Sequence, residues 1–336
     1  MIPIGSQKGW VTMIKNQWYA VLNSNEVEKG SVKAFKRMGE SLVFWRDLVG
    51  NIFCFEDRCP HRGVALSKGK IVDGNLQCPF HGFQFDGDGE CCLVPANGRN
   101  APKPKQIKAK RYPTFEVDGF IFIYWGETGS DAGQPQFFDN LMQLSYGTAQ
   151  DPWRSHYSRV IENQLDVAHL PFIHHNSIGR GNRTLVDGPL VEWENENKFF
   201  VYVFNRLDDG RRPKKPKELN PPSDPFHLEF IFPNLWQNYI SPDVRVVAAF
   251  VPVDDQNTIL YLRFYQGFLK IPVIKDIVNW MSMPMNLYIA HQDRGIVETH
   301  IPARSELRIG EKLIQADWPI VQYRKRREEL MAISST

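Results

Sequence analysis

Short hydrophobic runs bounded by turn-forming residues dominate the first third of the chain. Aromatic and β-branched residues fill the runs at 42–45, 51–55 and 120–125, as is typical of strands. Residues 126–136 are instead rich in glycine, with serine and proline, a composition that favours a linker. The pattern therefore predicts an all-β domain over residues 1–130, which includes an N-terminal extension, and a second domain over residues 131–336.

The second domain mixes strand and helix periodicities. Strand-like runs occur at 199–203, 246–251 and 259–264. Helical spacing extends from about 273 to 297, with a break favoured at Pro284, and again from 319 to 332. Together the two domains predict a chain of the α+β class.

Two short motifs in the first domain carry candidate metal ligands. Cys59-x-His61 is followed, after residues 62–77, by Cys78-x-x-His81. Each half joins one cysteine to one histidine, which is typical of a Rieske [2Fe–2S] cluster, whereas zinc sites usually pair cysteine with cysteine in one half. Small and turn-forming residues flank the ligands and favour two tight loops: Pro60, Gly63, Pro79 and Gly82.

A second set of candidate ligands lies in the segment 162–175. Asn163, Asp166 and His169 recur at intervals of three, so on a helix Asp166 could hydrogen-bond the ring of His169 and fix its orientation. His174 does not share that face. Because Pro171 cannot continue a helix, we expect the helix to end near residue 170 and the chain to bring His174 round to the same metal.

The carboxylate that would complete such a site must come from elsewhere. Our candidate is Asp293, which we expect inside an apolar helical stripe, since a buried carboxylate needs a partner and a metal is a suitable one. The stripe consists of Met285, Ile289 and Ile296. Glu298 is the second choice, and a helix-end role for Asp293, paired with Arg294 or solvent, is the alternative without a metal.

Composition and charge restrict the function classes. The 336-residue chain is 42% hydrophobic and 23% charged, and its net charge of +2 gives no signature of nucleic-acid or membrane binding. No run of about 18 apolar residues occurs, and residues 1–9 lack a signal-peptide core. We interpret the three cysteines outside the motifs, Cys54, Cys91 and Cys92, as free thiols, which fits a cytoplasmic location.

No dinucleotide fingerprint G-x-G-x-x-G follows a strand pattern, and no further cysteine set suits a plant-type ferredoxin. The chain is therefore expected to receive electrons from a separate NAD(P)H reductase, directly or through a ferredoxin. We expect a small-molecule site lined mostly by apolar residues of the segments 228–239, 245–250 and 281–288, with Asn238 and Arg245 as its polar groups.

The stretch from Cys59 to Pro95 resembles the N-terminal domain of the Rieske non-heme iron oxygenases, including the residues at 62–63, 66–69 and 83–86. Gln292-Asp293 is similar to the third-ligand motif of their alpha subunits. The four-residue gap after His169 matches the family at His174 better than at His175. A lone alpha-type chain of this length resembles the vanillate, dicamba and methylxanthine demethylase branch.

The resemblance implies a helix-grip catalytic domain, in which an antiparallel sheet wraps a long helix. It implies cluster ligands Cys59, His61, Cys78 and His81, and mononuclear Fe(II) ligands His169, His174 and Asp293, with O2 as co-substrate. Asn163 and Asp166 are the catalytic candidates. Asp166 would link an iron histidine to His81 of a neighbouring subunit in a homotrimer.

The implied activity is hydroxylation or O- or N-demethylation of a small, aromatic or heterocyclic substrate. Ring cis-dihydroxylation is the alternative. An electron-transfer protein that uses only the Rieske half and a structural zinc module are the rivals from other classes. The first rival predicts a second domain without a metal site, and the second predicts a colourless protein.

Overall fold

A computed structural model describes residues 13–126, 133–223 and 226–333. The chain forms two compact units. The N-terminal unit is Asn16–Pro135, and the C-terminal unit is Gln136–Thr336 together with Met1–Lys15. The predicted boundary between residues 130 and 131 lies outside the described residues.

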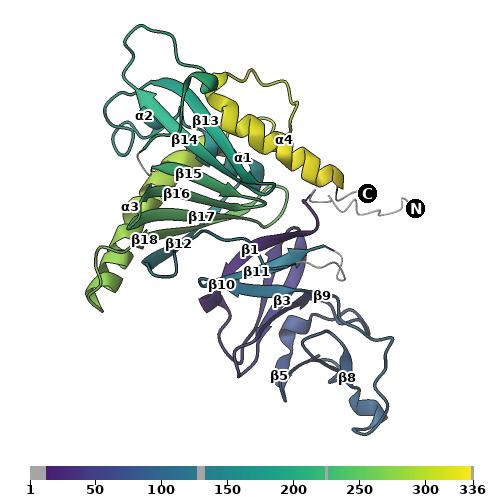
Figure 1. Ribbon diagram of the computed structural model, residues 1–336. Coiled ribbons are helices and arrows are strands. Elements are labelled where there is room, and N and C mark those ends of the chain that lie inside the picture. Colours follow the sequence, from purple (N-terminus) through teal and green to yellow (C-terminus); the bar gives the residue numbers. More distant parts are fainter. Residues whose placement is uncertain (1–12, 127–132, 224–225, 334–336) are drawn as a thin grey trace. The chain divides into compact units, whose positions relative to one another are not determined.

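Three antiparallel sheets build the N-terminal unit, which confirms its all-β class (Figure 1). The first has the order β1 (Gln17–Asn23), β11 (Phe120–Trp125), β10 (Thr114–Val117). The second has the order β2 (Val32–Arg37), β3 (Glu40–Arg46), β4 (Ile52–Glu56), β9 (Arg111–Tyr112). The third has the order β5 (Lys70–Val72), β6 (Asn75–Gln77), β7 (Gln84–Phe85), β8 (Cys91–Leu93).

A hydrophobic core joins the second and third of these sheets. Trp45 and Phe55 come from the second sheet, and Leu76 and Phe85 from the third. Cys59 and Cys78 belong to the same core. The two cysteines of the motifs are therefore held from the inside by packed aromatic and aliphatic side chains.

The C-terminal unit is a seven-stranded antiparallel sheet with helices on one face. Its strand order is β12 (Ser145–Trp153), β18 (Thr258–Gln266), β17 (Val244–Pro252), β16 (Leu235–Ser241), β15 (His227–Ile231), β14 (Lys198–Arg206), β13 (Leu185–Asn195). The helices are α1 (Tyr157–Leu165), α2 (Leu170–Ile173), α3 (Ile274–Val297) and α4 (Trp318–Ile333).

Glycine at position 147 lets α3 lie directly against β12. A Cβ there would meet the backbone oxygen of Asn279 at 2.3 Å and the sulfur of Met283 at 3.1 Å. A residue without a side chain is therefore required where the helix crosses the strand. The register places Gly147 on the same sheet face as Phe230, whose ring contacts Tyr323 of α4 at 5.4 Å between centroids. Both α3 and α4 therefore cover one face of the sheet.

The break predicted at Pro284 is wrong, because α3 runs unbroken from Ile274 to Val297. Pro284 lies on the exposed side of the helix. A carbonyl that loses its partner there can be hydrated by solvent, so the proline does not end the helix. Within the described part of the chain, none of the helices combines the length and the apolar character needed to cross a membrane.

Candidate metal centres

The chain changes direction sharply between α1 and α2, and this break positions two histidines. Asp166 has extended backbone angles (φ −74°, ψ 121°) and caps the C-terminus of α1. Its Oδ1 accepts hydrogen bonds from the backbone N–H groups of Ala168 (2.7 Å) and His169 (3.3 Å). The predicted continuous helix through His169 is therefore wrong, since the Asp166 side chain stabilises a turn that ends it.

Pro171 starts a helix here rather than ending one. It lies in the first turn of α2, where the missing N–H would have no intrahelical partner in any case. His169 is the N-cap and His174 the C-cap of this short helix. The two histidines thus flank a single helical turn, which lets their rings approach each other, with centroids 5.2 Å apart.

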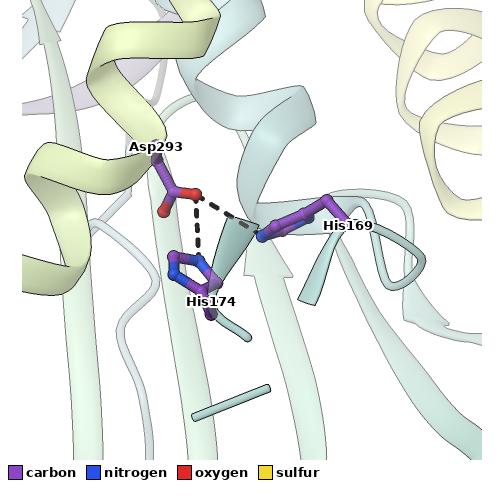
Figure 2. A group of neighbouring side chains, drawn as sticks. All are labelled: His169, His174 and Asp293. Carbon is purple, nitrogen blue, oxygen red and sulfur yellow. Dashed lines mark ion pairs between the residues drawn. The ribbon is translucent and has the colours of Figure 1, made fainter. Parts of the chain in front are cut away.

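Asp293 of α3 meets these two rings, and Figure 2 shows the three side chains converging. Its Oδ1 lies 3.0 Å from Nε2 of His174 and 3.5 Å from Nε2 of His169. One ligand atom from each residue falls within 4.8 Å of the others. Oδ1 of Asp293 is buried and has no hydrogen-bond partner among the described residues. Two imidazoles and an unpartnered carboxylate oxygen fit a divalent metal, and this donor set suits non-heme Fe(II).

Neighbouring side chains orient the ligands. Nδ1 of His174 lies 3.0 Å from Oε1 of Gln292, to which it can donate, so that Nε2 stays free for a metal. Burial lowers the pKa of His174, but Asp293 and Gln292 together raise it above its ordinary value. Nδ1 of His169 lies 3.8 Å from Oδ1 of Asp166, beyond hydrogen-bond distance but close enough for charge to act. Burial opposes ionisation of Asp166, yet His169 and the two backbone N–H groups hold its pKa below the usual range.

Asp293 lies on the buried side of α3, but the stripe predicted to enclose it is wrong. Met285 and Ile296 are more than half exposed. The residues that share the buried face with Asp293 are Met283, Ala290 and Val297. The predicted stripe is displaced by one to two residues because the outer face of this helix is apolar as well, so hydrophobicity alone does not identify the inner face.

The other candidate ligands of the catalytic domain make different contacts. Glu298 accepts from the backbone N–H of Arg154 at 2.8 Å and pairs with its guanidinium at 3.3 Å. His175 is exposed, and its Nδ1 faces the backbone oxygen of Phe172. Asn163 is buried on α1, and its Nδ2 has no partner among the described residues. The catalytic roles assigned to Asn163 and Asp166 stay predictions.

The four motif residues of the N-terminal unit also come together. Cys59 and Cys78 are buried and their thiols interact, and burial raises the pKa of Cys59 to about 11, with Cys78 adding to the effect. His61 and His81 are exposed, with ring centroids 4.9 Å apart, and His61 stacks on Phe83. Two inner thiols and two outer imidazoles fit a cluster with one Cys-bound iron and one His-bound iron.

The remaining cysteines, Cys54, Cys91 and Cys92, form no disulfide within the described residues. Burial raises the pKa of each of their thiols.

A buried ionic network beside the mononuclear site has no counterpart in the sequence predictions. Glu162, next to Asn163 on α1, accepts hydrogen bonds from Nε and Nη2 of Arg324 on α4, at 2.6 and 2.9 Å. Arg159 bonds the same carboxylate at 3.0 Å, and Glu311 contacts both arginines. The spacing of Arg159 and Glu162 suggests a helix pair, but no local signal connects them to Arg324.

Two domain families match this chain. Residues 17–115 match the Rieske [2Fe-2S] domain. Residues 153–332, more than half of the chain, match the vanillate O-demethylase oxygenase C-terminal domain.

Curated relatives and solved structures agree with these matches. The chain is 27% identical over 299 residues to the 4beta-methylsterol monooxygenase of Methylococcus capsulatus, covering 84% of this chain and 75% of that protein. It is 35% identical over 173 residues to chlorophyllide a oxygenase of Chlamydomonas reinhardtii, covering 50% of this chain but only 26% of that protein's length. NdmA of Pseudomonas putida CBB5 superposes with a TM-score of 0.76 at 25% identity, over 95% of this chain and 92% of that one.

Dicamba monooxygenase bound to dicamba shares the fold, with a TM-score of 0.65 at 17% identity over 96% of this chain and 99% of that one. Sequence, fold and the two ligand sets thus agree. The chain belongs to the Rieske oxygenases, with a Rieske [2Fe–2S] domain followed by a catalytic domain of the vanillate O-demethylase type.

Proposed function

We propose that this protein is the oxygenase component of a multicomponent Rieske oxygenase, which uses O2 to hydroxylate or to O- or N-demethylate a small aromatic or heterocyclic substrate. The observation that carries the proposal is that the rings of His169 and His174 meet Oδ1 of Asp293, a buried carboxylate oxygen without a hydrogen-bond partner among the described residues. The family implies a Rieske [2Fe–2S] cluster, a mononuclear iron and O2 as co-substrate.

Different residues of the chain would bind the two metal centres. Cys59, His61, Cys78 and His81 would hold the cluster, and the two histidines with Asp293 would hold the iron on one side, leaving the other open. When bound, the two groups supply one-electron transfer and O2 activation. Gln292 would keep the His174 ring oriented with Nε2 toward the metal.

Electrons would come from a separate NAD(P)H reductase, directly or through a ferredoxin. A ferredoxin complex is known for the oxygenase of carbazole 1,9a-dioxygenase, which shares this fold at 21% identity. We further propose a cytoplasmic homotrimer, in which Asp166 of one subunit approaches His81 of the next. The side chain of Asp166 is 31% exposed, which leaves it available for such a contact.

The demethylating or hydroxylating activity is favoured by the type of the C-terminal domain and by the likeness to NdmA, a structure of which contains caffeine. Ring cis-dihydroxylation is the alternative. A methyl ether probe separates the two, because dealkylation releases formaldehyde whereas dihydroxylation produces a diol.

The test is electron paramagnetic resonance of the iron-loaded, anaerobically reduced protein with nitric oxide. We expect a reduced Rieske signal and a high-spin iron–nitrosyl signal. Asp293→Ala should abolish the nitrosyl signal and keep the Rieske signal, whereas the control Glu298→Gln should keep both. A Rieske signal without a nitrosyl signal in the fully loaded wild-type protein would reduce the function to electron transfer.

A further inference from the structure

The two faces of the C-terminal sheet differ in charge. On the helix-covered face, two adjacent rows of paired residues across the strands contain no charged residue. The first row consists of Val201, Leu228, Asn238, Val246, Phe264 and Gly147. The second row consists of Phe199, Phe230, Trp236, Ala248, Leu262 and Ala149. Glu229, Arg245 and Arg263 of the same strands lie on the opposite face by register, whereas Asp151 of β12 lies on the helix-covered face, one row beyond Ala149.

Arg245 is therefore not available to a ligand on the helix-covered face, contrary to expectation. It lies over the ring of Tyr239 at 3.9 Å and donates to the backbone oxygen of Asp139 at 3.0 Å. Glu229 likewise pairs with Lys198 at 3.1 Å on its own face. The helix-covered rows have no cation with which to neutralise an anionic ligand.

Two polar atoms in these rows lack partners. Nε1 of Trp236, a residue only 6% exposed, and Oδ1 of Asn238 are both buried without a hydrogen bond among the described residues. The two residues are two apart on β16, so their side chains stand on the same face about 7 Å apart. A buried donor or acceptor without a partner is unfavourable, and a ligand with complementary groups would satisfy both.

The register also relates these rows to the helix that carries Asp293. On β12, Asp151 contacts His291 and Arg294 of α3, whereas Gly147 lies against Asn279 and Met283. Ala149, which ends the row of Trp236, therefore lies level with α3 between Met283 and His291. The part of α3 level with Ala149 is therefore within about three helical turns of Asp293.

We propose that Trp236 and Asn238 are specificity-determining residues that select a neutral substrate bearing a hydrogen-bond acceptor, such as a carbonyl oxygen, over a carboxylate of the same shape. The inference rests on the proposed function and adds the substrate class. The indole N–H would donate to the acceptor, and the Asn238 amide, which can present oxygen or nitrogen, would take a second polar group. A carboxylate would be buried there without a counter-ion, which is strongly unfavourable.

The experiment compares three probes of one shape: 4-methoxyacetophenone, 4-methoxybenzoate and 4-ethylanisole. Binding to the iron-loaded protein is measured by calorimetry and by perturbation of the iron–nitrosyl signal. We expect the ketone to bind about tenfold more tightly than ethylanisole, since it adds one buried hydrogen bond, and the benzoate to bind most weakly.

Variants test which residues carry the preference. Trp236→Phe should remove most of the ketone's advantage, because the carbonyl oxygen then loses the indole N–H, and Asn238→Leu should remove the part that an amide N–H contributes, while binding of ethylanisole changes little. Asn195→Leu, on an exposed position of β13, is the matched control and should leave the order unchanged. The thermal unfolding temperature and the nitrosyl signal without probe report whether a variant has kept its fold and its iron.

The outcomes separate the two proposals. A missing nitrosyl signal in the wild-type protein contradicts the proposed function. With that signal present, benzoate binding as tightly as the ketone, a ketone advantage that survives both substitutions, or no binding of any probe overturns the inference.

Discussion

Removing the charge of Glu162 should destabilise the C-terminal unit more than any exposed charge change. Glu162 is 5% exposed and balances two buried arginines, Arg159 and Arg324. Glu162→Gln keeps the shape but leaves one positive charge uncompensated, because Glu311 then faces both arginines alone. Breaking a buried pair in this way costs about 3–5 kcal/mol.

We expect the lower end of that range, because Glu311 is partly exposed and admits solvent to the network. For a unit of this size, about 3 kcal/mol corresponds to a fall of about 6–12 °C in the unfolding temperature. Differential scanning calorimetry of the iron-loaded protein would measure it. The change should also weaken iron retention, since α1 leads directly into the turn at Asp166 and His169.

Glu329→Gln is the control, on the helix α4 that carries Arg324. Glu329 pairs with Arg326 at the surface, at 3.1 Å and three residues apart. Such pairs contribute about 0.2–0.5 kcal/mol, so its unfolding temperature should change by no more than about 2 °C. Equal shifts for the two variants would refute the assignment of Glu162 as the centre of a buried network.

Three further predictions follow from single residues. Burial, together with Arg327, Arg304 and Arg159, lowers the pKa of His156 to about 3, whereas the unfolded chain takes up this proton near pH 6.5. The free energy of unfolding should therefore fall by about 1.4 kcal/mol for each pH unit below about 6.5. In His156→Gln, the slope of the urea-unfolding free energy against pH should be flatter. Gly147→Ala should displace α3 and lower both the unfolding temperature and the iron content measured by atomic absorption, and unchanged values for both would contradict the close approach to Asn279. Cys59→Ser should lose the visible absorbance of the cluster, whereas Cys54→Ser, buried in the same unit, should keep it.

Local spacing indicates the candidate histidines but neither the carboxylate that joins them nor the path of the chain between them. The gap after His169 that matches the family favours His174 over His175. The structure brings His169 and His174 together with Asp293. Pro171 correctly signals a change of structure. The direction of that change was misread, since proline is as compatible with a first turn as with a helix end. The hydrogen bonds that Asp166 accepts from the backbone N–H groups decide between a helix end and a helix start, and these bonds form only in the folded chain.

Long-range features lay beyond the sequence for a different reason. Glu162 and Arg324 are far apart in the chain, and neither shows by its neighbours that it is buried. The strands 42–45, 51–55 and 120–125 were predictable because each is a local hydrophobic run. Which face of the C-terminal strands carries helices was not predictable, and the pairing register alone places Asn238 on the helix-covered face and Arg245 on the opposite one.

Three separate structural contacts position different ligands of the mononuclear site. The Asp166 turn sets the approach of His169, the Glu162–Arg324 bridge fixes α1 before that turn, and Gly147 sets the depth of α3 and therefore of Asp293. Loss of the ion pair between Glu162 and Arg324 should therefore make the position of His169 less fixed. A side chain at position 147 should displace Asp293. Combining Glu162→Gln with Gly147→Ala should lower iron affinity by about the product of the two single effects, because the two changes act on different ligands and share no contact.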